Sequence, residues 1–320
     1  MMLKALKISA ALLMIVPCLA FCATNSFAPP SGKTLLLIGQ DRNTISRYAK
    51  AMGNAPSGTM FYTSPPRLEG LKWASEYGSG PQDGSALLHS YPNSVIQVGL
   101  YLVDSIDGVL AGNYDNHLRE LARWIKKARR PVYLRIGYEF DLPLNHYDPE
   151  QYKQAFRYVV DFLRKEGVRN AAYVWHSQCV ENSSQQWMDW YPGDDYVDWF
   201  GVSIFSTQQI PTASDFLELA RLHGKPFMIC ESTPEGNYTV RGKMDWFRHI
   251  FQFIKEKNVE AFCYINSNWD IMPMYKGQHW GDSRVEKYPE IKDLWLKEIN
   301  QDRYLKASPD LFHKLGWNKT

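Results

Sequence analysis

The sequence predicts a single (β/α)8 barrel, a TIM barrel of the α/β class, and three observations support this prediction. Eight short runs rich in β-branched and aromatic residues recur along the chain, and amphipathic helical patterns separate them. About 295 residues follow a predicted leader, which is enough for one large barrel domain. The turn after the first run, "LLLIGQDRNT", lacks the glycine-rich phosphate loop that a doubly wound sheet usually carries there.

The eight expected strands are identified by their apolar composition and by the turn residues that bound them. The first, "TLLLIGQ", begins at Thr34, and the last, "VEAFCYINSNWD", ends at Asp270. In chain order the expected strands cover residues 34–40, 59–64, 94–103, 131–140, 170–177, 199–206, 225–233 and 259–270. Buried strands that alternate with helices in this way close into a parallel barrel with the helices outside.

Helices are expected between these strands. The predicted helical segments are residues 44–52, 113–128, 149–165, 214–222 and 244–257. In the third of them, Asp148 is a good N-cap, and Phe156 and Val160 belong to an apolar stripe at helical spacing. The polar, glycine-rich segment 65–92 is expected to form loops that wall the top of a cleft, and segment 304–317 is expected to pack on the outside as a short helix.

Residues 1–23 are predicted to be a secretory signal peptide, and residues 24–320 to form the barrel domain. Lysines precede an apolar stretch over residues 8–19, and small residues follow it. The stretch is too short to span a bilayer comfortably. Cleavage after residue 20, 22 or 23 fits the pattern, and a lipid anchor on Cys22 is an alternative. A secreted or periplasmic protein is therefore expected.

Composition excludes several classes of partner. The net charge of +2 comes from two leader lysines, because 36 basic residues minus 2 leaves 34 against 34 acidic residues. Such a neutral chain gives no electrostatic reason to bind nucleic acid or an anionic membrane. Cys179, Cys230 and Cys263 have no CxxC spacing, so free thiols are expected, with no disulfide framework, metal site or cofactor. We expect the chain to act as a monomer.

Two glutamates end predicted strands on opposite sides of the barrel. Glu139 ends the fourth strand in "RIGYEFD", and Glu231 ends the seventh in "MICEST". Functional residues of such barrels collect at the carboxyl ends of the strands. Side-chain alternation predicts that Arg135 lies beneath Glu139, with Gly137 leaving room between them. The same rule predicts that Cys230 points away from the Glu231 face, toward the helices.

A pair of carboxyls in this arrangement suits retaining glycoside hydrolysis. One carboxyl must be protonated to donate to the leaving oxygen, and the other must be ionised to attack the anomeric carbon, at a separation of roughly 5–5.5 Å. Either glutamate alone could instead cap a loop or pair with a lysine, and the pair together favours catalysis. A metal-dependent barrel hydrolase would need an HxH pair, and His176 is the only histidine at a predicted strand end. Because crowded charges at a site cost stability, Glu231→Gln is expected to cost little.

The segments "RIGYEFD", "YDPEQYKQAFRYVVDFLRKEGVRNAAYVWHS" and "ICEST" resemble glycoside hydrolase family 26 or a close relative among the retaining barrels. The resemblance implies that Glu139 is the acid/base and Glu231 the nucleophile of an enzyme that cleaves a β-linked polysaccharide internally. Two positions depart from the family's mannanases. Tyr138 stands where they usually have histidine, and Phe205 stands where an aromatic hydroxyl often contacts the nucleophile. The sugar is therefore open between β-mannan and another β-glycan.

Sugar-binding sites combine aromatic platforms with amides and carboxylates. Trp269, in the polar setting "NSNWD", is the best platform candidate. The other expected substrate-binding residues are Arg135, Trp175, His176 and Tyr264. Trp199, Phe200 and Trp246 are expected in the core, and Tyr138 is expected to face away from Glu139. The alternative function is a catalytically weak barrel that only binds glycans, although both glutamates are retained.

Overall fold

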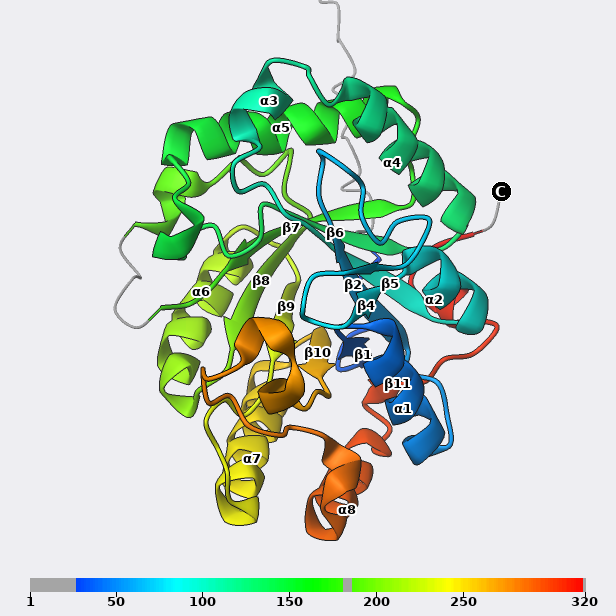
Figure 1. Cartoon of the computed structure of the whole chain (residues 1–320), viewed down its shortest axis with the longest axis vertical. Coiled ribbons are helices and arrows are strands. Elements are labelled where there is room, and N and C mark those ends of the chain that lie inside the picture. The colour runs from blue at the N-terminus through cyan, green and yellow to red at the C-terminus, as the bar shows by residue number, and fades with distance from the viewer. Residues whose placement is uncertain (1–26, 181–185, 319–320) are drawn as a thin grey trace, which may run out of the picture.

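The computed structural model describes residues 27–180 and 186–318. The predicted leader, residues 1–23, lies outside the described residues. Within them, eight parallel strands form a closed barrel at the centre of the molecule, and helices surround it (Figure 1). The predicted single-domain (β/α)8 barrel is confirmed.

All eight predicted strands are present in the barrel. They are β1 (Thr34–Gly39), β2 (Gly58–Thr63), β5 (Val95–Leu100), β6 (Val132–Ile136), β7 (Ala171–Ser177), β8 (Trp199–Ile204), β9 (Phe227–Ser232) and β10 (Ala261–Ile265). Parallel pairing of β1 with β10, for example Leu36 with Phe262, closes the barrel. A short strand, β11 (Tyr304–Leu305), pairs with β1 from outside. β6 ends earlier than predicted, at Ile136.

Within the described residues an α-helix follows each barrel strand except β7, which is followed by the 3-10 helix η2 (Trp187–Trp190). The bounds of the α-helices are α1 (Arg42–Met52), α2 (Gly84–Ser90), α3 (Ile106–Leu110), α4 (Asp115–Ala128), α5 (Pro149–Lys165), α6 (Ile210–Leu222), α7 (Val240–Lys257), α8 (Pro289–Ile299) and α9 (Leu311–Lys314). The bounds of α5 match the prediction, because the Asp148 carboxylate accepts from the backbone N–H groups of Glu150 and Gln151. Sequence reasoning missed α8, whose buried stripe is Ile291, Trp295 and Ile299.

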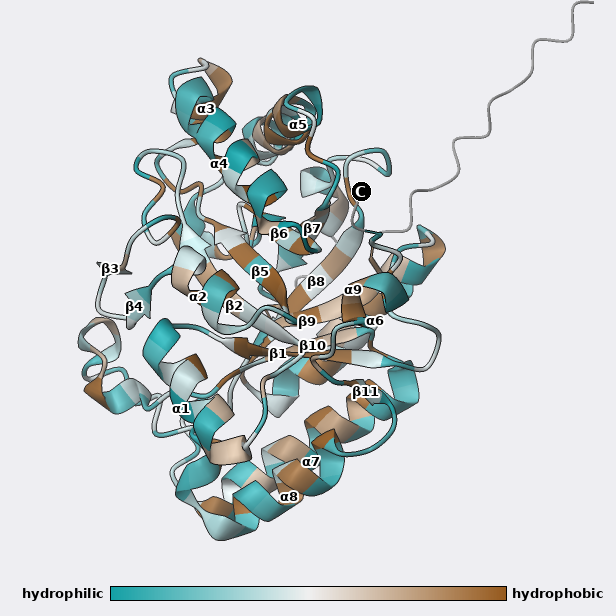
Figure 2. Cartoon of the chain, turned by 90° about the vertical axis from the view of Figure 1, so that its right-hand side faces the viewer, coloured by the Kyte–Doolittle hydropathy of each residue, from teal (hydrophilic) through white to brown (hydrophobic). Residues whose placement is uncertain are grey.

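Side chains of the barrel strands alternate between two apolar cores. Outward side chains pack against the helices, whose outer surfaces are hydrophilic (Figure 2). Inward side chains, such as Met60 and Trp199, fill the barrel. Phe27 and the α9 residue Phe312 belong to the inner core, and the Tyr133 hydroxyl donates to the Phe27 carbonyl at 2.7 Å. These residues close the barrel at the amino-terminal ends of its strands.

The described residues contain neither a membrane-spanning helix nor a cluster of metal-binding side chains. In residues 27–180 and 186–318, no helix is long and apolar enough to cross a membrane. The same part of the chain contains no group of three or more His, Cys, Asp or Glu side chains suited to a metal ion. Cys179, Cys230 and Cys263 are buried free thiols, as expected.

Candidate active site

A pocket of about 920 Å³ opens at the carboxyl-terminal ends of the barrel strands, and both Glu139 and Glu231 line it. Segment 65–92, which includes the two-stranded ribbon of β3 (Ser75–Glu76) and β4 (Pro81–Gln82), contributes one wall. The part of this segment from Pro66 to Gln82 lines the pocket, as predicted, whereas Gly84–Ser90 forms α2 rather than a loop.

The backbone turns sharply before Glu139. β6 ends at Ile136, and Gly137 then has a φ of +55°, a conformation that favours glycine. A Cβ on Gly137 would lie 2.8 Å from the ring of Tyr152. The absent side chain therefore makes room for Tyr152 and not for a contact between Arg135 and Glu139, so the prediction for Gly137 is wrong. Strand alternation ends at this turn. Tyr138 and Glu139 therefore both line the pocket, and the prediction that Tyr138 faces away is wrong.

The loop that carries Glu139 is held by polar contacts on both sides. Glu139 has a φ of +55°, which is uncommon for a residue with a side chain. The Asn145 side-chain amide donates to the Glu139 carbonyl at 2.8 Å. Asp141 accepts from the Ser177 hydroxyl at 2.5 Å and from the Gln178 N–H at 2.6 Å, which ties the loop to the end of β7. Asp141 thus positions the loop that presents Glu139.

Glu231 reaches the pocket because β9 contains a bulge. β8 and β9 pair Val202 with Ile229 and then Ser203 with Glu231, so Cys230 is an extra residue on β9. Ile229 packs in the outer core and Cys230 in the inner core. The prediction that Cys230 points toward the helices is therefore wrong. Strict alternation would turn Glu231 outward, and the bulge turns it into the pocket instead.

Arg135 supports Glu231 from inside the barrel. Its side chain is 0 % exposed, and Nη1 forms an ion pair with the Glu231 carboxylate. The guanidinium carbon lies 5.3 Å from the ring centroid of Tyr62 and 4.9 Å from that of Tyr138. Gly99 makes room for this group, because a Cβ there would lie 2.6 Å from Tyr62 and 2.9 Å from Arg135.

Glu139 has a different environment from Glu231. Burial and the nearby charge of Glu231 raise the pKa of Glu139 to about 8, although the Ser203 hydroxyl donates to its Oε1 at 2.6 Å. At neutral pH Glu139 therefore holds a proton, while Glu231 is paired with a guanidinium. One acid and one carboxylate at the same pocket can perform general acid catalysis and nucleophilic attack.

His176 connects the two carboxyl environments. Arg135 Nη1 lies 3.2 Å from His176 Nδ1, and His176 Nε2 lies 3.0 Å from the Ser203 hydroxyl. Arg135 and His176 were expected to bind substrate. Both are fully buried behind Glu139 and Glu231, so they contact the carboxyls and their neighbours rather than the open pocket. Ser203 was missed, although it has the inward parity of Trp199 on the same strand.

Two other predicted substrate-binding residues lie in the outer core, which corrects their assignment. Trp175 stacks on Phe140 with ring centroids 4.5 Å apart, and Tyr264 packs on Trp295 at 5.0 Å. Strand alternation explains why Trp175 lies in the outer core. It precedes His176, which faces inward, so the Trp175 ring must face the helices.

Trp269, the expected platform, is 1 % exposed and lies behind the pocket wall. Its ring centroid is 4.8 Å from that of Trp280 and 4.6 Å from that of Tyr275, and its Nε1 donates to Thr233 at 3.2 Å. Trp280 and Tyr275 line the pocket, as does Tyr101. Sequence reasoning missed these aromatic residues. Tyr275 and Trp280 lie in loops whose course strand alternation does not determine, whereas Tyr101 directly follows β5.

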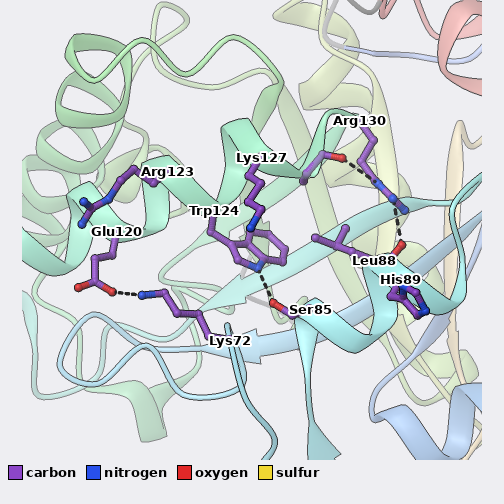
Figure 3. Close-up of a pocket in the computed structure, with 10 residues that line it drawn as sticks. Lys72, Ser85, Leu88, His89, Glu120, Arg123, Trp124, Lys127 and Arg130 are labelled. Atoms are coloured by element: carbon purple, nitrogen blue, oxygen red, sulfur yellow. Dashed lines mark hydrogen bonds and ion pairs between the residues drawn. The ribbon is translucent and has the colours of Figure 1, made fainter.

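A second pocket, of about 560 Å³, lies outside the barrel between α2 and α4 (Figure 3). Several of its polar side chains contact each other or the backbone. Lys72 pairs with Glu120 at 2.5 Å, Trp124 donates to Ser85 at 3.2 Å, and Arg130 donates to backbone carbonyls. These contacts hold α2 and α4 in place, and the pocket lacks the paired carboxyls of the first.

Comparisons with known proteins give consistent matches. The model of the family described as glycosyl hydrolase family 26 matches residues 116–279, which include both glutamates. A β-1,3-xylanase, TXYA, from a Vibrio species is 32% identical over 91% of this chain and 70% of that protein. A β-1,3-xylanase from an Alcaligenes species is also 32% identical, over 90% of this chain and 68% of that protein.

Solved structures share the fold at low sequence identity. A family 26 β-mannanase from Bacteroides ovatus superposes with a TM-score of 0.63 and 17% identity, over 91% of this chain and 95% of that one. The catalytic domain of a family 26 endo-β-1,4-mannanase from Bacillus sp. JAMB-750 gives a TM-score of 0.67 and 16% identity, over 93% and 94% of the two chains.

Proposed function

The chain belongs to glycosyl hydrolase family 26 and is a glycoside hydrolase, and from this we propose that it cleaves a neutral β-glycan by a retaining double displacement. Glu139 acts as the acid/base and Glu231 as the nucleophile. The observation that carries the proposal is the contrast between the two carboxyls at one pocket. Burial and the nearby charge of Glu231 raise the pKa of Glu139 to about 8, while Arg135 forms an ion pair with Glu231.

In the first step, Glu231 attacks the anomeric carbon and the glycosidic C–O bond breaks. Glu139 gives its proton to the departing oxygen, so the leaving chain departs as an alcohol and Glu139 becomes a carboxylate. The Glu231 carboxylate becomes an ester in the glycosyl-enzyme. Its negative charge disappears at this point, which removes one of the influences that raise the pKa of Glu139.

In the second step, Glu139 acts as a base. It takes a proton from water, the water oxygen bonds to the anomeric carbon, and the ester bond to Glu231 breaks. Because the esterified Glu231 no longer repels a charge on Glu139, the carboxylate form needed here is easier to hold than it is in the free enzyme. Both residues then return to their starting states, and the anomeric configuration is retained.

The pocket chemistry favours an uncharged polymer. Its ionisable acidic and basic lining residues are Arg67, Glu69, Asp104, Glu139 and Glu231. Acidic side chains therefore outnumber basic ones, which disfavours uronic-acid or sulfated glycans. Aromatic residues Tyr275 and Trp280 offer apolar faces for sugar rings. Because the two curated relatives named above are β-1,3-xylanases, we propose internal cleavage of β-1,3-xylan.

The proposed site of action is outside the cytoplasm. Residues 1–23 have the pattern of an export signal, and Cys22 would be the point of any lipid anchor. We propose that the exported chain acts as a monomer, which size-exclusion chromatography with light scattering would test. N-terminal sequencing of the protein recovered from culture medium or periplasm would identify the cleavage site.

A polysaccharide panel tests the function. Wild type and Glu231→Ala are incubated with β-1,3-xylan, β-1,4-xylan, β-mannan and β-glucan, and the products are identified by mass spectrometry. We expect wild type to release oligosaccharides from β-1,3-xylan, with retained anomeric configuration in proton NMR, and the variant to release none. Equal sugar release by both proteins would reject the role of Glu231. Binding of a glycan without cleavage would favour the non-catalytic alternative.

A further inference from the structure

A chain of hydrogen bonds joins the two glutamates through side chains inside the barrel. Arg135 Nη1 donates to Glu231 and lies 3.2 Å from His176 Nδ1. His176 Nε2 lies 3.0 Å from Ser203 Oγ, and Ser203 Oγ lies 2.6 Å from Glu139 Oε1. Arg135, His176 and Ser203 are all 0 % exposed, so water does not compete for these contacts.

The direction of each hydrogen bond follows from Arg135. A guanidinium has donors only, so Nδ1 of His176 must accept. His176 therefore carries its hydrogen on Nε2 and donates to Ser203, which leaves the Ser203 hydrogen for Glu139. Burial and the charge of Arg135 keep the pKa of His176 well below its ordinary value, so the ring stays neutral and keeps this tautomer.

We propose that His176 and Ser203 are positioning residues that hold the acidic proton of Glu139 on Oε2. Oε1 accepts the Ser203 hydrogen, so Oε1 is the unprotonated oxygen of the neutral acid. The inference rests on the proposed function, in which that proton passes from Oε2 to the glycosidic oxygen as the C–O bond breaks. No proton moves along the chain. The Ser203 hydrogen bond then stabilises the carboxylate that remains.

Other groups also face Glu139 and must be distinguished from Ser203. Burial and the charges of Glu231 on β9 and Asp141 raise the pKa of Glu139, and Arg135 on β6 lowers it together with Ser203 on β8. The neighbouring phenols stay neutral, because burial raises their own pKa values; they belong to Tyr138, Tyr147 and Tyr275. Ser203 can be removed without changing any of these charges, which makes it the informative substitution.

The titration of Glu139 tests the chain without substrate. Carbon-13 NMR of the side-chain carboxyls measures it in the full-length protein, and Glu139→Gln assigns the resonance. Ser203→Ala should raise the Glu139 pKa by about one unit, as expected when a carboxylate loses one hydrogen bond, and Ser203→Thr should restore it. Ser232→Ala is the matched control, because that buried hydroxyl on β9 donates to the Cys263 carbonyl at 2.7 Å. It should leave the titration unchanged.

Leaving-group dependence tests the position of the proton. Phenyl and dinitrophenyl glycosides of the β-1,3-xylan disaccharide differ in their need for an acid, because dinitrophenolate departs without protonation. Ser203→Ala should slow the phenyl substrate by roughly 10- to 100-fold and the dinitrophenyl substrate by less than about twofold. His176→Leu should behave in the same way. His176→Gln should recover most of the rate, since its amide can accept from Arg135 and donate to Ser203.

Two results would overturn the inference. One is a Glu139 titration that is the same in Ser203→Ala, His176→Leu and wild type. The other is equal slowing of both glycosides, which would indicate a structural defect rather than loss of acid catalysis. If wild type cleaves neither glycoside and no polysaccharide, the proposed function fails instead, and the titration still decides whether Ser203 controls the Glu139 carboxyl.

Discussion

The buried guanidinium of Arg135 donates a hydrogen bond to Glu231, which is 96 positions further along the chain. The pair joins β6 to β9 across the interior of the barrel, and Tyr62 and Tyr138 pack on the guanidinium. Sequence alternation predicted that Arg135 lies beneath Glu139. In the structure Arg135 pairs with Glu231 instead. Each glutamate therefore has its own hydrogen-bond donor, Arg135 for Glu231 and Ser203 for Glu139.

This ion pair changes the stability expected for Glu231 variants. Removing the carboxylate leaves the Arg135 charge buried and unpaired, so Glu231→Ala should lower the free energy of unfolding by about 3–5 kcal/mol in urea titrations. Glu231→Gln retains an acceptor and should lose less, yet more than the small cost expected from sequence alone. Glu235→Ala, on the exposed loop beyond, is the control and should be neutral. Unchanged stability of Glu231→Ala would mean that the ion pair is not formed.

Glu139→Gln should change how stability depends on pH. The Glu139 pKa is about 8 in the folded protein and about 4.5 as an unperturbed glutamate, so between these values the folded state binds more protons. Stability from this group is fully present below pH 4.5 and is lost as pH rises to about 8. Glu139→Gln does not ionise and so does not lose this stability. The difference between the unfolding midpoints of the variant and of wild type should therefore shift in favour of the variant as pH rises from 4.5 to about 8. A difference that stays constant with pH would contradict the assignment.

Activity should fall on the alkaline side with the same group. Because the proposed acid must be protonated in the free enzyme, kcat/KM should decline as pH rises through about 8. Initial rates on β-1,3-xylan or an aryl glycoside of its disaccharide, measured across pH at substrate concentrations below KM, would show this limb. A plateau that continues well above this pH would exclude Glu139 as the acid.

Trp280 and Trp269 are in contact, and their positions predict different effects of substitution, one on substrate binding and the other on stability. Trp280 lines the pocket, so Trp280→Ala should raise KM for oligosaccharides with a stability loss below about 1 kcal/mol. Trp269 is buried behind it, so Trp269→Ala should lower the free energy of unfolding by about 3–5 kcal/mol. Steady-state kinetics and urea unfolding of both variants measure the contrast. Similar effects from the two would remove the distinction between wall and core.

Gly99→Ala should damage the support of Glu231. The added methyl would crowd Tyr62 and Arg135, and a shift of the supporting group by about 1 Å can reduce turnover roughly 100-fold. Gly58→Ala is the control. Its Cβ would lie 2.5 Å from Leu37, which is a similar steric clash, and Gly58 is the first residue of β2, at the end of the strand opposite the pocket. Both should lose about 1–3 kcal/mol of stability, and only Gly99→Ala should lose kcat. Loss of kcat in both variants would show a general packing effect.

The fold was predictable because local patterns determine it. The Asp148 cap and the apolar spacing of 149–165 specify α5, and short apolar runs specify the eight strands. The prediction that Glu139 and Glu231 belong to one site rested on the same patterns, and the structure places both at one pocket: Glu139 follows β6, and Glu231 lies near the end of β9.

The site's support was less predictable, because it depends on departures from regular geometry. The positive φ of Gly137 ends alternation early, and the bulge at Cys230 reverses it on β9. Neither feature has a distinct signal in one sequence. For Trp175 and His176 the correct answer could have been predicted. They are neighbours on one strand, so regular alternation allows only one of them to face the barrel interior.

The barrel is filled at the amino-terminal ends of its strands, and this limits how a substrate can enter the pocket and how products can leave it. Phe27 and Phe312 join the inner core there, so within residues 27–180 and 186–318 this core separates the pocket from the opposite end of the barrel. A substrate that reaches Glu139 and Glu231 must therefore enter through the mouth of the pocket, and both products of cleavage must leave through the same opening.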